Sequence, residues 1–257
     1  MKRTRKSIES RRKSILKLLE HQEKISVEEL SSKLKISEIT IRRDLQHLNE
    51  AGLVERFHGG ASLNTTNYTT NIFSSSLTQN KHAIAKEAAK YVEDGDTIFI
   101  NTSSTALLVL DYITAKQVTV ITNNASAIFS SYKENIYVVL TGGELRMPKE
   151  SLVGEFALNN LARVRAAKCF LGCSGLSSKD GFTTAVLQEV AINELMLKNT
   201  LKKRFILADK TKVGVSHSFF SGSIKEIDYL ITDNEADDKE IVRLERAGVN
   251  VIQVDLN

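Results

Sequence analysis

Seven short apolar segments alternate with candidate helices from residue 81 onward. Several are apolar at almost every position and rich in β-branched residues. Such runs are typical of strands that are buried on both faces, and the alternation of strands with helices favours a mainly parallel sheet. The segments read DTIFI, VTVIT, YVVLTG, KCFLGC, RFILA, DYLIT and NVIQV. We therefore predict an α/β domain in which helices cover a mainly parallel sheet.

Residues 7–58 show a helical pattern instead. Two short helices are followed by a third from about residue 38 to 51, which Gly52 would end. Ser26 opens the second helix in a capping-box pattern with Glu29, and LVERFHGGASL then alternates briefly, as a small β wing would. The expected buried residues are Ile15, Leu18 and Leu19 in the first helix and Ile41, Leu45 and Leu48 in the third.

The segment between these two regions has a different composition. Residues 61–80 carry no charge and are rich in Ser, Thr and Asn, which is typical of a linker. The sequence therefore predicts a small winged helix-turn-helix domain over residues 1–60, a linker over residues 61–80 and an α/β domain over residues 81–257.

Positive charge is concentrated at the N-terminal end. Residues 1–60 hold 14 of the 35 Lys and Arg residues but 9 of the 31 Asp and Glu residues. This asymmetry is expected when one domain meets a polyanion, although a solvated basic tail would produce the same charge. No apolar run approaches the roughly 20 residues that a membrane helix needs, and the N-terminus lacks the pattern of a signal peptide. We therefore expect a cytoplasmic protein with no membrane partner, with Cys169 and Cys173 as buried thiols.

The third helix is the candidate DNA-reading element. In a helix-turn-helix, the second helix of the motif enters the major groove and the residues near its N-terminal end reach base edges. Arginine suits both guanine and phosphate contacts, so either role is open for the two arginines of this helix. The candidate DNA-binding residues are Ser37 (also the expected N-cap), Glu38, Thr40, Arg42, Arg43 and His47 in the helix, with Arg56 and His58 in the wing. Taken alone, a helical protein-binding module would have a similar pattern.

A specific resemblance favours DNA. The run ISEITIRRDLQHLNEAGLVERFHGGA resembles the N-terminal signature of DeoR-family transcriptional regulators, in which Thr-Ile-Arg-Arg-Asp-Leu precedes an Arg-x-His-Gly-Gly-Ala wing. The resemblance continues through nearly the whole chain. It implies a C-terminal sensor related to ribose-phosphate isomerases and CoA transferases, which binds a phosphorylated sugar or a similar intermediate. The matching landmarks are Lys81-x-x-Ile84-Ala85, residues 101–105, ITNN at 121–124, TGGEL at 141–145, Gly154, GFTT at 181–184, Glu189, LADKTKVG at 207–214 and ITD at 231–233.

Four of these landmarks are polar loops that follow predicted strands. In an open parallel sheet, ligands bind beyond the carboxyl ends of the strands. Hydroxyl and N–H groups that lead into a helix suit a phosphate, glycines admit close approach, and amides suit sugar hydroxyls. The predicted effector-binding residues are Asn101, Thr102, Ser103, Ser104, Thr105, Asn123, Asn124, Gly142, Gly143, Glu144, Asp209 and Lys212.

Each loop also has a simpler explanation. Ser104 or Thr105 would cap a helix, and residues 142–143 and 209–212 would form turns. The joint placement of the loops at strand ends favours the binding site. This chain also departs from the family pattern, which usually has Asp and Gly where Asn101 and Ser103 stand. The other departures are Ala106, Ala167 in place of an acid, and Asn193 in place of a basic residue.

The main hypothesis is therefore a DNA-binding regulator, a repressor of a carbohydrate-utilisation operon that is controlled by a phosphorylated sugar. We expect a homodimer or higher homo-oligomer on double-stranded operator DNA, with no cofactor and no metal site. One alternative is a sugar-phosphate isomerase-like enzyme with a DNA-binding appendage, for which Asp209, Glu144 and Glu189 are the candidate general bases. The other is a regulator whose sensor no longer binds a ligand.

Overall fold

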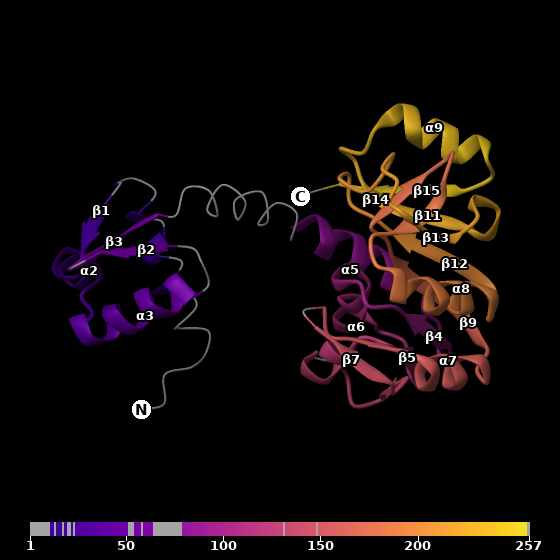
Figure 1. Cartoon of the computed structure of the whole chain (residues 1–257), viewed down its shortest axis with the longest axis horizontal. Coiled ribbons are helices and arrows are strands. Elements are labelled where there is room, and N and C mark those ends of the chain that lie inside the picture. The colour runs from indigo at the N-terminus through magenta and orange to yellow at the C-terminus, as the bar shows by residue number, and fades with distance from the viewer. Residues whose placement is uncertain are drawn as a thin grey trace. The chain divides into compact units, whose positions relative to one another are not determined.

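The computed structural model divides the chain into two compact units, Met1–Ser76 and Leu77–Asn257 (Figure 1). It describes residues 11–12, 14–16, 18–19, 22, 24–50, 54–57, 59–63, 79–130, 132–147 and 149–255, without the side chains of His47 and Glu50. The candidate DNA-binding residue His58 and the side chain of His47 therefore lie outside the described residues, as do residues 64–78 of the expected linker.

The N-terminal unit has the predicted winged helix-turn-helix architecture. After helical residues among 11–19, its elements are β1 (Lys24–Ser26), α2 (Val27–Leu34), α3 (Glu38–Glu50), β2 (Val54–Phe57) and β3 (Gly60–Leu63). The strands form one sheet in the order β1-β3-β2, with antiparallel pairing. The predicted core residues are buried, except that Leu18 is only partly buried. Residues 61–63, which we expected in the linker, are instead paired in the wing.

Local sequence signals explain how this unit turns. The Ser26 side chain accepts a hydrogen bond from the Glu29 N–H at 3.0 Å, which caps α2 as predicted. Lys35 ends α2 in the left-handed conformation, with a φ of 53°. The Ser31 hydroxyl donates to the Ile36 carbonyl at 2.6 Å and so fixes the tight connection to α3. The spacing between the two helices is thereby set by short-range contacts.

The second unit contains a seven-stranded sheet, and the seven predicted segments supply all of its strands. They are β4 (Thr97–Ile100), β5 (Val118–Thr122), β6 (Ile136–Leu140), β9 (Ala166–Gly172), β12 (Thr200–Leu207), β14 (Tyr229–Asp233) and β15 (Asn250–Val254). The order is β15-β14-β12-β9-β4-β5-β6, and every neighbouring pair is parallel. The predicted α/β fold class is confirmed.

Helices cover both faces of this sheet. One core cluster joins the helical residues 79–89 with α5 (Ser104–Leu107) and α6 (Val109–Tyr112), and it takes alternate strand residues such as Ile98 and Ile100. The other cluster takes the intervening residues, such as Phe99, and packs them against α7 (Glu155–Ala162), α8 (Val190–Lys198) and α9 (Asp238–Arg246). The alternation explains why the strands are apolar throughout. Residues 79 and 80, which we expected in the linker, are already helical.

Several short elements were not predicted. A hairpin of β7 (Glu144–Arg146) and β8 (Ser151–Val153) follows β6. A small antiparallel sheet contains β10 (Gly175–Ser177), β11 (Gly181–Thr184) and β13 (Phe219–Gly222). The 3-10 helices are Ala125–Phe129, Leu187–Glu189 and Ile224–Glu226.

The strand order contains a topological switch between β4 and β9. From β4 the chain builds outward through β5 and β6, and then returns to the other side of β4 to place β9, β12, β14 and β15. The connections on the two sides leave in opposite directions, so a crevice opens beyond the carboxyl ends of β4 and β9. This crevice is where the fold itself favours a ligand site.

A buried charge cluster lies near the amino ends of the same two strands. Lys168 on β9 is 3% exposed, and its ammonium group lies 2.6 Å from the Asp96 carboxylate and 2.7 Å from the Glu93 carboxylate. Burial alone would lower the pKa of Lys168, but the hydrogen bonds to Asp96 and Glu93 outweigh it and raise the pKa. The cluster ties β9 to the start of β4.

Candidate functional site

A pocket of about 330 Å³ lies at the switch, where β4, β5, β9 and β12 end. Eight of the predicted effector residues line it: Asn101, Thr102, Ser103, Ser104, Thr105, Asn124, Asp209 and Lys212. The polar residues that line it but were absent from the predicted set are Lys81, Ser126, Lys149, Ser174, Thr184 and Glu189. The structure thus brings together three of the four predicted loops.

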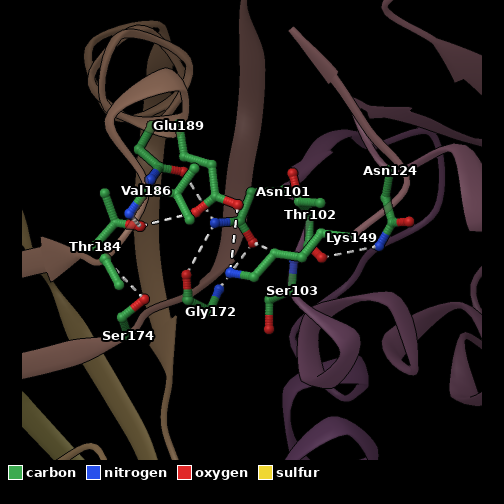
Figure 2. Close-up of polar contacts among 12 residues, drawn as sticks. Asn101, Thr102, Ser103, Asn124, Lys149, Gly172, Ser174, Thr184, Val186 and Glu189 are labelled. Carbon is green, nitrogen blue, oxygen red and sulfur yellow. Dashed lines mark hydrogen bonds and ion pairs between the residues drawn. The ribbon is translucent and has the colours of Figure 1, made fainter. Parts of the chain in front are cut away.

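Asn101 is fully occupied by protein contacts. Its side-chain oxygen accepts from the N–H groups of Gly172 at 3.0 Å and Ser103 at 3.3 Å. Its amide group donates to the Gly172 carbonyl at 2.9 Å (Figure 2). It also donates to the Asn193 side-chain oxygen at 2.9 Å. The side chain therefore holds β4 to β9 and to α8. Both Asn101 and Asn193 depart from the family pattern, and here they meet as a neutral pair.

Ser103 acts first as a helix cap. Its hydroxyl accepts from the Ala106 N–H at 3.4 Å, so the capping role that we left open falls one residue before Ser104. The helix that it caps, α5, is a single turn, so its dipole can offer a phosphate little support. Ser103 also packs on Gly172, where an added Cβ would lie 1.9 Å from the Ser103 hydroxyl oxygen. The serine at 103 therefore requires the glycine at 172.

Three lysines and two carboxylates give the pocket its electrostatics. The Lys81 ammonium donates to the Ser104 hydroxyl at 3.4 Å, and Lys149 lies 3.5 Å from the Glu189 carboxylate. Lys212 has no ion-pair partner among the residues that the structure describes. Asp209 is 3% exposed, and its carboxylate accepts from the N–H and hydroxyl of Thr211. The lysines exceed the carboxylates by one, which favours an anionic ligand.

The two asparagines after β5 have different environments. Asn124 lines the pocket, donates to the Thr102 carbonyl at 3.2 Å and accepts from the Ser126 N–H at 3.1 Å. Asn123 does not line it. Its amide donates to the Thr102 hydroxyl at 2.8 Å and to the Leu152 carbonyl at 3.2 Å. Both asparagines therefore fix the loop that carries Thr102.

The loop after β6 is not brought to this pocket. A Cβ on Gly143, whose φ is 111°, would lie 2.4 Å from the Val153 carbonyl oxygen, so the glycine is required by the β7–β8 hairpin. Gly142 has a φ of 68°, which fits the turn explanation that we left open. Glu144 is exposed on β7 and does not line the pocket either.

The two cysteines remain thiols. Cys169 is buried as expected, whereas Cys173 is half-buried and lines the pocket. Desolvation raises the pKa of the Cys173 thiol to about 12, against the opposing effect of the Lys212 charge. At neutral pH the Cys173 side chain is therefore an uncharged group in the pocket wall. Within the described residues, no cluster of three His, Cys, Asp or Glu side chains could hold a metal ion.

The predicted DNA-reading face of α3 carries exposed arginines. Arg42 is paired with Glu38 at 3.1 Å, one turn earlier, whereas Arg43 is exposed and has no partner within the described residues. The hydroxyls of Ser37 and Thr40 lie 2.9 Å apart at the start of the helix. Arg56 of the wing donates to the Gln46 side chain at 2.7 Å. The wing and the helix thus present their polar groups together.

Asp44 has a role that the sequence pattern did not reveal. It is 2% exposed on α3, and its carboxylate oxygen accepts from Arg11 and Arg12, each at 3.1 Å. Its hydrogen bond with Arg11 raises the pKa of that guanidinium group. Asp44 therefore anchors the first helix to α3, and does so from the side away from solvent.

These two units define a DNA-binding regulator with a second domain that carries a polar pocket. The similarity of the chain to known protein families agrees with this class. Residues 11–67 match the DeoR-like helix-turn-helix domain, and residues 76–234 match the DeoR C terminal sensor domain. The chain belongs to the DeoR family of transcriptional regulators. No helix among the described residues has both the length and the apolar character needed to cross a membrane.

Named relatives cover almost the full chain. The HTH-type transcriptional regulator GolR of Listeria innocua is 35% identical, over 94% of this chain and 96% of that protein. The HTH-type transcriptional regulator GlpR of Haloferax volcanii is 34% identical, over 94% and 96%. The lactose phosphotransferase system repressor of Streptococcus mutans is 32% identical, over 90% and 94%. A solved ribose 5-phosphate isomerase A from Methanocaldococcus jannaschii aligns with a TM-score of 0.35 at 20% identity, over 51% of this chain and 52% of that one.

Proposed function

We propose that this regulator represses a carbohydrate-utilisation operon and that a phosphorylated sugar bound at the β4/β9 switch controls it. The observation that carries the proposal is the pocket itself, in which Lys81, Lys149 and Lys212 surround hydroxyl and amide groups. Its volume of about 330 Å³ suits a small ligand. One relative is named as a lactose phosphotransferase system repressor, which supports a carbohydrate derivative as the class of ligand.

The pocket offers separate groups for the two parts of such a ligand. A phosphate would be held by Lys212 and Lys81, together with the hydroxyl of Ser104, because charge-assisted hydrogen bonds are the strong ones. Asp209 and Asn124 would accept from and donate to sugar hydroxyls. The hydrogen-bonding groups of the Asn101 side chain already have protein partners. Asn101 would therefore position the loop and make no direct contact with the ligand.

Control of DNA binding follows from coupling between the two ligands. We propose a homodimer or higher oligomer, because helix-turn-helix proteins bind two half-sites of an operator as dimers. If the effector changes the affinity for DNA by some factor, DNA must change the affinity for the effector by the same factor. A gel-shift assay with the upstream DNA and a panel of sugar phosphates tests this. No specific DNA shift in any condition would refute the proposal.

Lys212→Ala is expected to weaken effector binding by roughly tenfold to a hundredfold while leaving operator binding intact. A charge-assisted hydrogen bond contributes about 1.5–3 kcal/mol. Lys212 lines the pocket and has no ion-pair partner among the described residues, so its ammonium group is available to a phosphate. Thermal-shift titration with sugar phosphates measures the effect. Lys210→Ala is the matched control, because Lys210 is paired with Glu235 and does not line the pocket.

The thermal-shift titration also separates the alternatives. An intact response in Lys212→Ala would remove Lys212 from the site. If no phosphorylated sugar stabilises the wild-type protein, the regulator whose sensor no longer binds a ligand becomes the better hypothesis. The isomerase-like enzyme is the less favoured alternative, because the relatives of this chain are named as regulators or repressors.

Arg43→Ala is expected to weaken operator binding by roughly tenfold to a hundredfold, because an arginine contact with a base edge contributes about 1–3 kcal/mol. Fluorescence anisotropy with an operator duplex measures it. Lys33→Ala on α2 removes the same charge from a residue that is already paired with Glu29 at 2.9 Å, and serves as the control. Unchanged affinity in Arg43→Ala would place Arg43 outside the DNA interface.

A further inference from the structure

Lys149 and Glu189 both line the pocket and form an ion pair there. Lys149 belongs to the turn between β7 and β8, and Glu189 ends the 3-10 helix that leads into α8. In Figure 2 the Lys149 side chain extends past the Asn101 loop toward Glu189. The turn itself is fixed on the β5 side of the pocket, because the Ala125 N–H donates to the Glu150 carbonyl at 2.8 Å. The pair therefore joins the two sides of the switch.

The two partners are held very differently. Glu189 is 9% exposed, and one of its carboxylate oxygens accepts from the Thr184 hydroxyl at 2.8 Å. That hydroxyl is in turn fixed by the Val186 N–H at 3.2 Å. The Lys149 side chain is 47% exposed, and its 3.5 Å contact is longer than the 2.7–2.9 Å of a strong charge-assisted bond. The Glu189 carboxylate is thus held in place by hydrogen bonds, whereas the exposed Lys149 side chain is free to change its rotamer.

Lys149 also differs from the other pocket lysines. Within the part of the chain that the structure describes, neither Lys81 nor Lys212 has a carboxylate partner, and the Lys81 ammonium donates to the Ser104 hydroxyl. A phosphate that enters among the three lysines would therefore find two available ammonium groups and a third already neutralised by Glu189. Its charge of nearly −2 at neutral pH exceeds that of the single carboxylate.

We propose that Glu189 is an internal anionic competitor, which holds Lys149 until the phosphate group of the effector takes it over. This inference rests on the proposed function and names the regulation of its site. The exchange moves one ammonium group from a carboxylate oxygen to a phosphate oxygen, with no covalent change. It also releases the contact between the β7–β8 hairpin and the 3-10 helix that leads into α8.

Two substitutions that break the same ion pair separate this idea from a structural role. Lys149→Met removes the cation that the phosphate needs, so the affinity for inorganic phosphate should fall by about two- to fivefold. Glu189→Gln removes the competitor and frees Lys149, so the affinity should rise by about two- to fivefold. A bridge with only a structural role would shift both variants in the same direction.

The measurement is isothermal titration of the full-length protein with inorganic phosphate, at constant ionic strength maintained with chloride. Arg146→Met and Glu155→Gln are the controls, since they make the same charge changes at residues that do not line the pocket. Melting temperatures check that each variant is folded. Unchanged or weaker binding in Glu189→Gln overturns the inference and leaves the proposed function standing. Absence of phosphate binding in both the wild type and Glu189→Gln overturns both the inference and the phosphate site of the proposed function.

Discussion

Asn101→Asp is expected to lower the free energy of unfolding of the C-terminal unit by about 2–4 kcal/mol. Asn101 is 5% exposed, and its amide group donates to the Gly172 carbonyl and to the Asn193 side chain. A carboxylate in its place would put negative charge against the Gly172 oxygen, and none of the described residues that hydrogen-bond to the Asn101 side chain is a cation. The same substitution restores the acid that the family pattern usually has at this position.

The residue at position 193, which accepts a hydrogen bond from Asn101, should decide whether an acid at position 101 is tolerated. Asn193→Lys alone would leave a buried ammonium beside the Asn101 amide, but in combination with Asn101→Asp it would supply the missing donor and charge. We expect the double variant to recover at least half of the lost stability. Burial raises the pKa of the new carboxyl above its ordinary value of about 3.9. Because the neutral acid can donate, the loss in the single variant should grow as the pH rises from about 4 to 8.

Urea denaturation followed by circular dichroism measures these differences. Asn250→Asp is the matched control, because its exposed amide also donates to a carbonyl, that of Asp228 at 3.0 Å, and its loss should stay within about 0.5 kcal/mol. If the losses from Asn101→Asp and Asn193→Lys simply add in the double variant, the two residues are not coupled in this way.

Lys168→Met is expected to destabilise the C-terminal unit by about 3–5 kcal/mol, because removing one partner of a buried ion pair leaves an uncompensated charge. Asp96 is 6% exposed and would lose the ammonium group that lies 2.6 Å away. Adding Asp96→Asn removes that charge, so the double variant should be more stable than Lys168→Met alone.

The matched control is Lys90→Met, which breaks an exposed pair with Glu87 and should cost less than about 1 kcal/mol. Thermal and urea unfolding of the three variants provide the comparison. Similar losses for Lys168→Met and Lys90→Met would mean that burial does not govern the energy of the Lys168 pair.

The sequence predicted the strands of the large sheet well, because burial on both faces leaves a local signal in each strand. It did not predict the small sheet or the β7–β8 hairpin, whose strands of three or four residues are too short to show a period. The order of the strands also lay beyond it, since order depends on contacts between segments that are distant in the chain.

The candidate site was predicted only in part, because only some of its residues lie in segments that a local sequence pattern marks. Loops that follow strands can be located along the chain, and residues 101–105 and Asp209 of the predicted loops do line the pocket. Lys149 could not be found this way, because it reaches the pocket from a hairpin turn that no periodic pattern marks. Gly142 and Gly143 were included because glycines admit ligands, but their positive φ angles serve the hairpin.

The switch between β4 and β9 has a consequence for how the protein is made. The pocket needs residues from Lys81 through Lys212, so it cannot exist on the ribosome until β12 has emerged and docked beside β9. The helix-turn-helix unit, by contrast, is complete within the first quarter of the chain and can fold as soon as it leaves the exit tunnel. Each newly made molecule therefore has its DNA-reading surface before it has a pocket through which a metabolite could act on it.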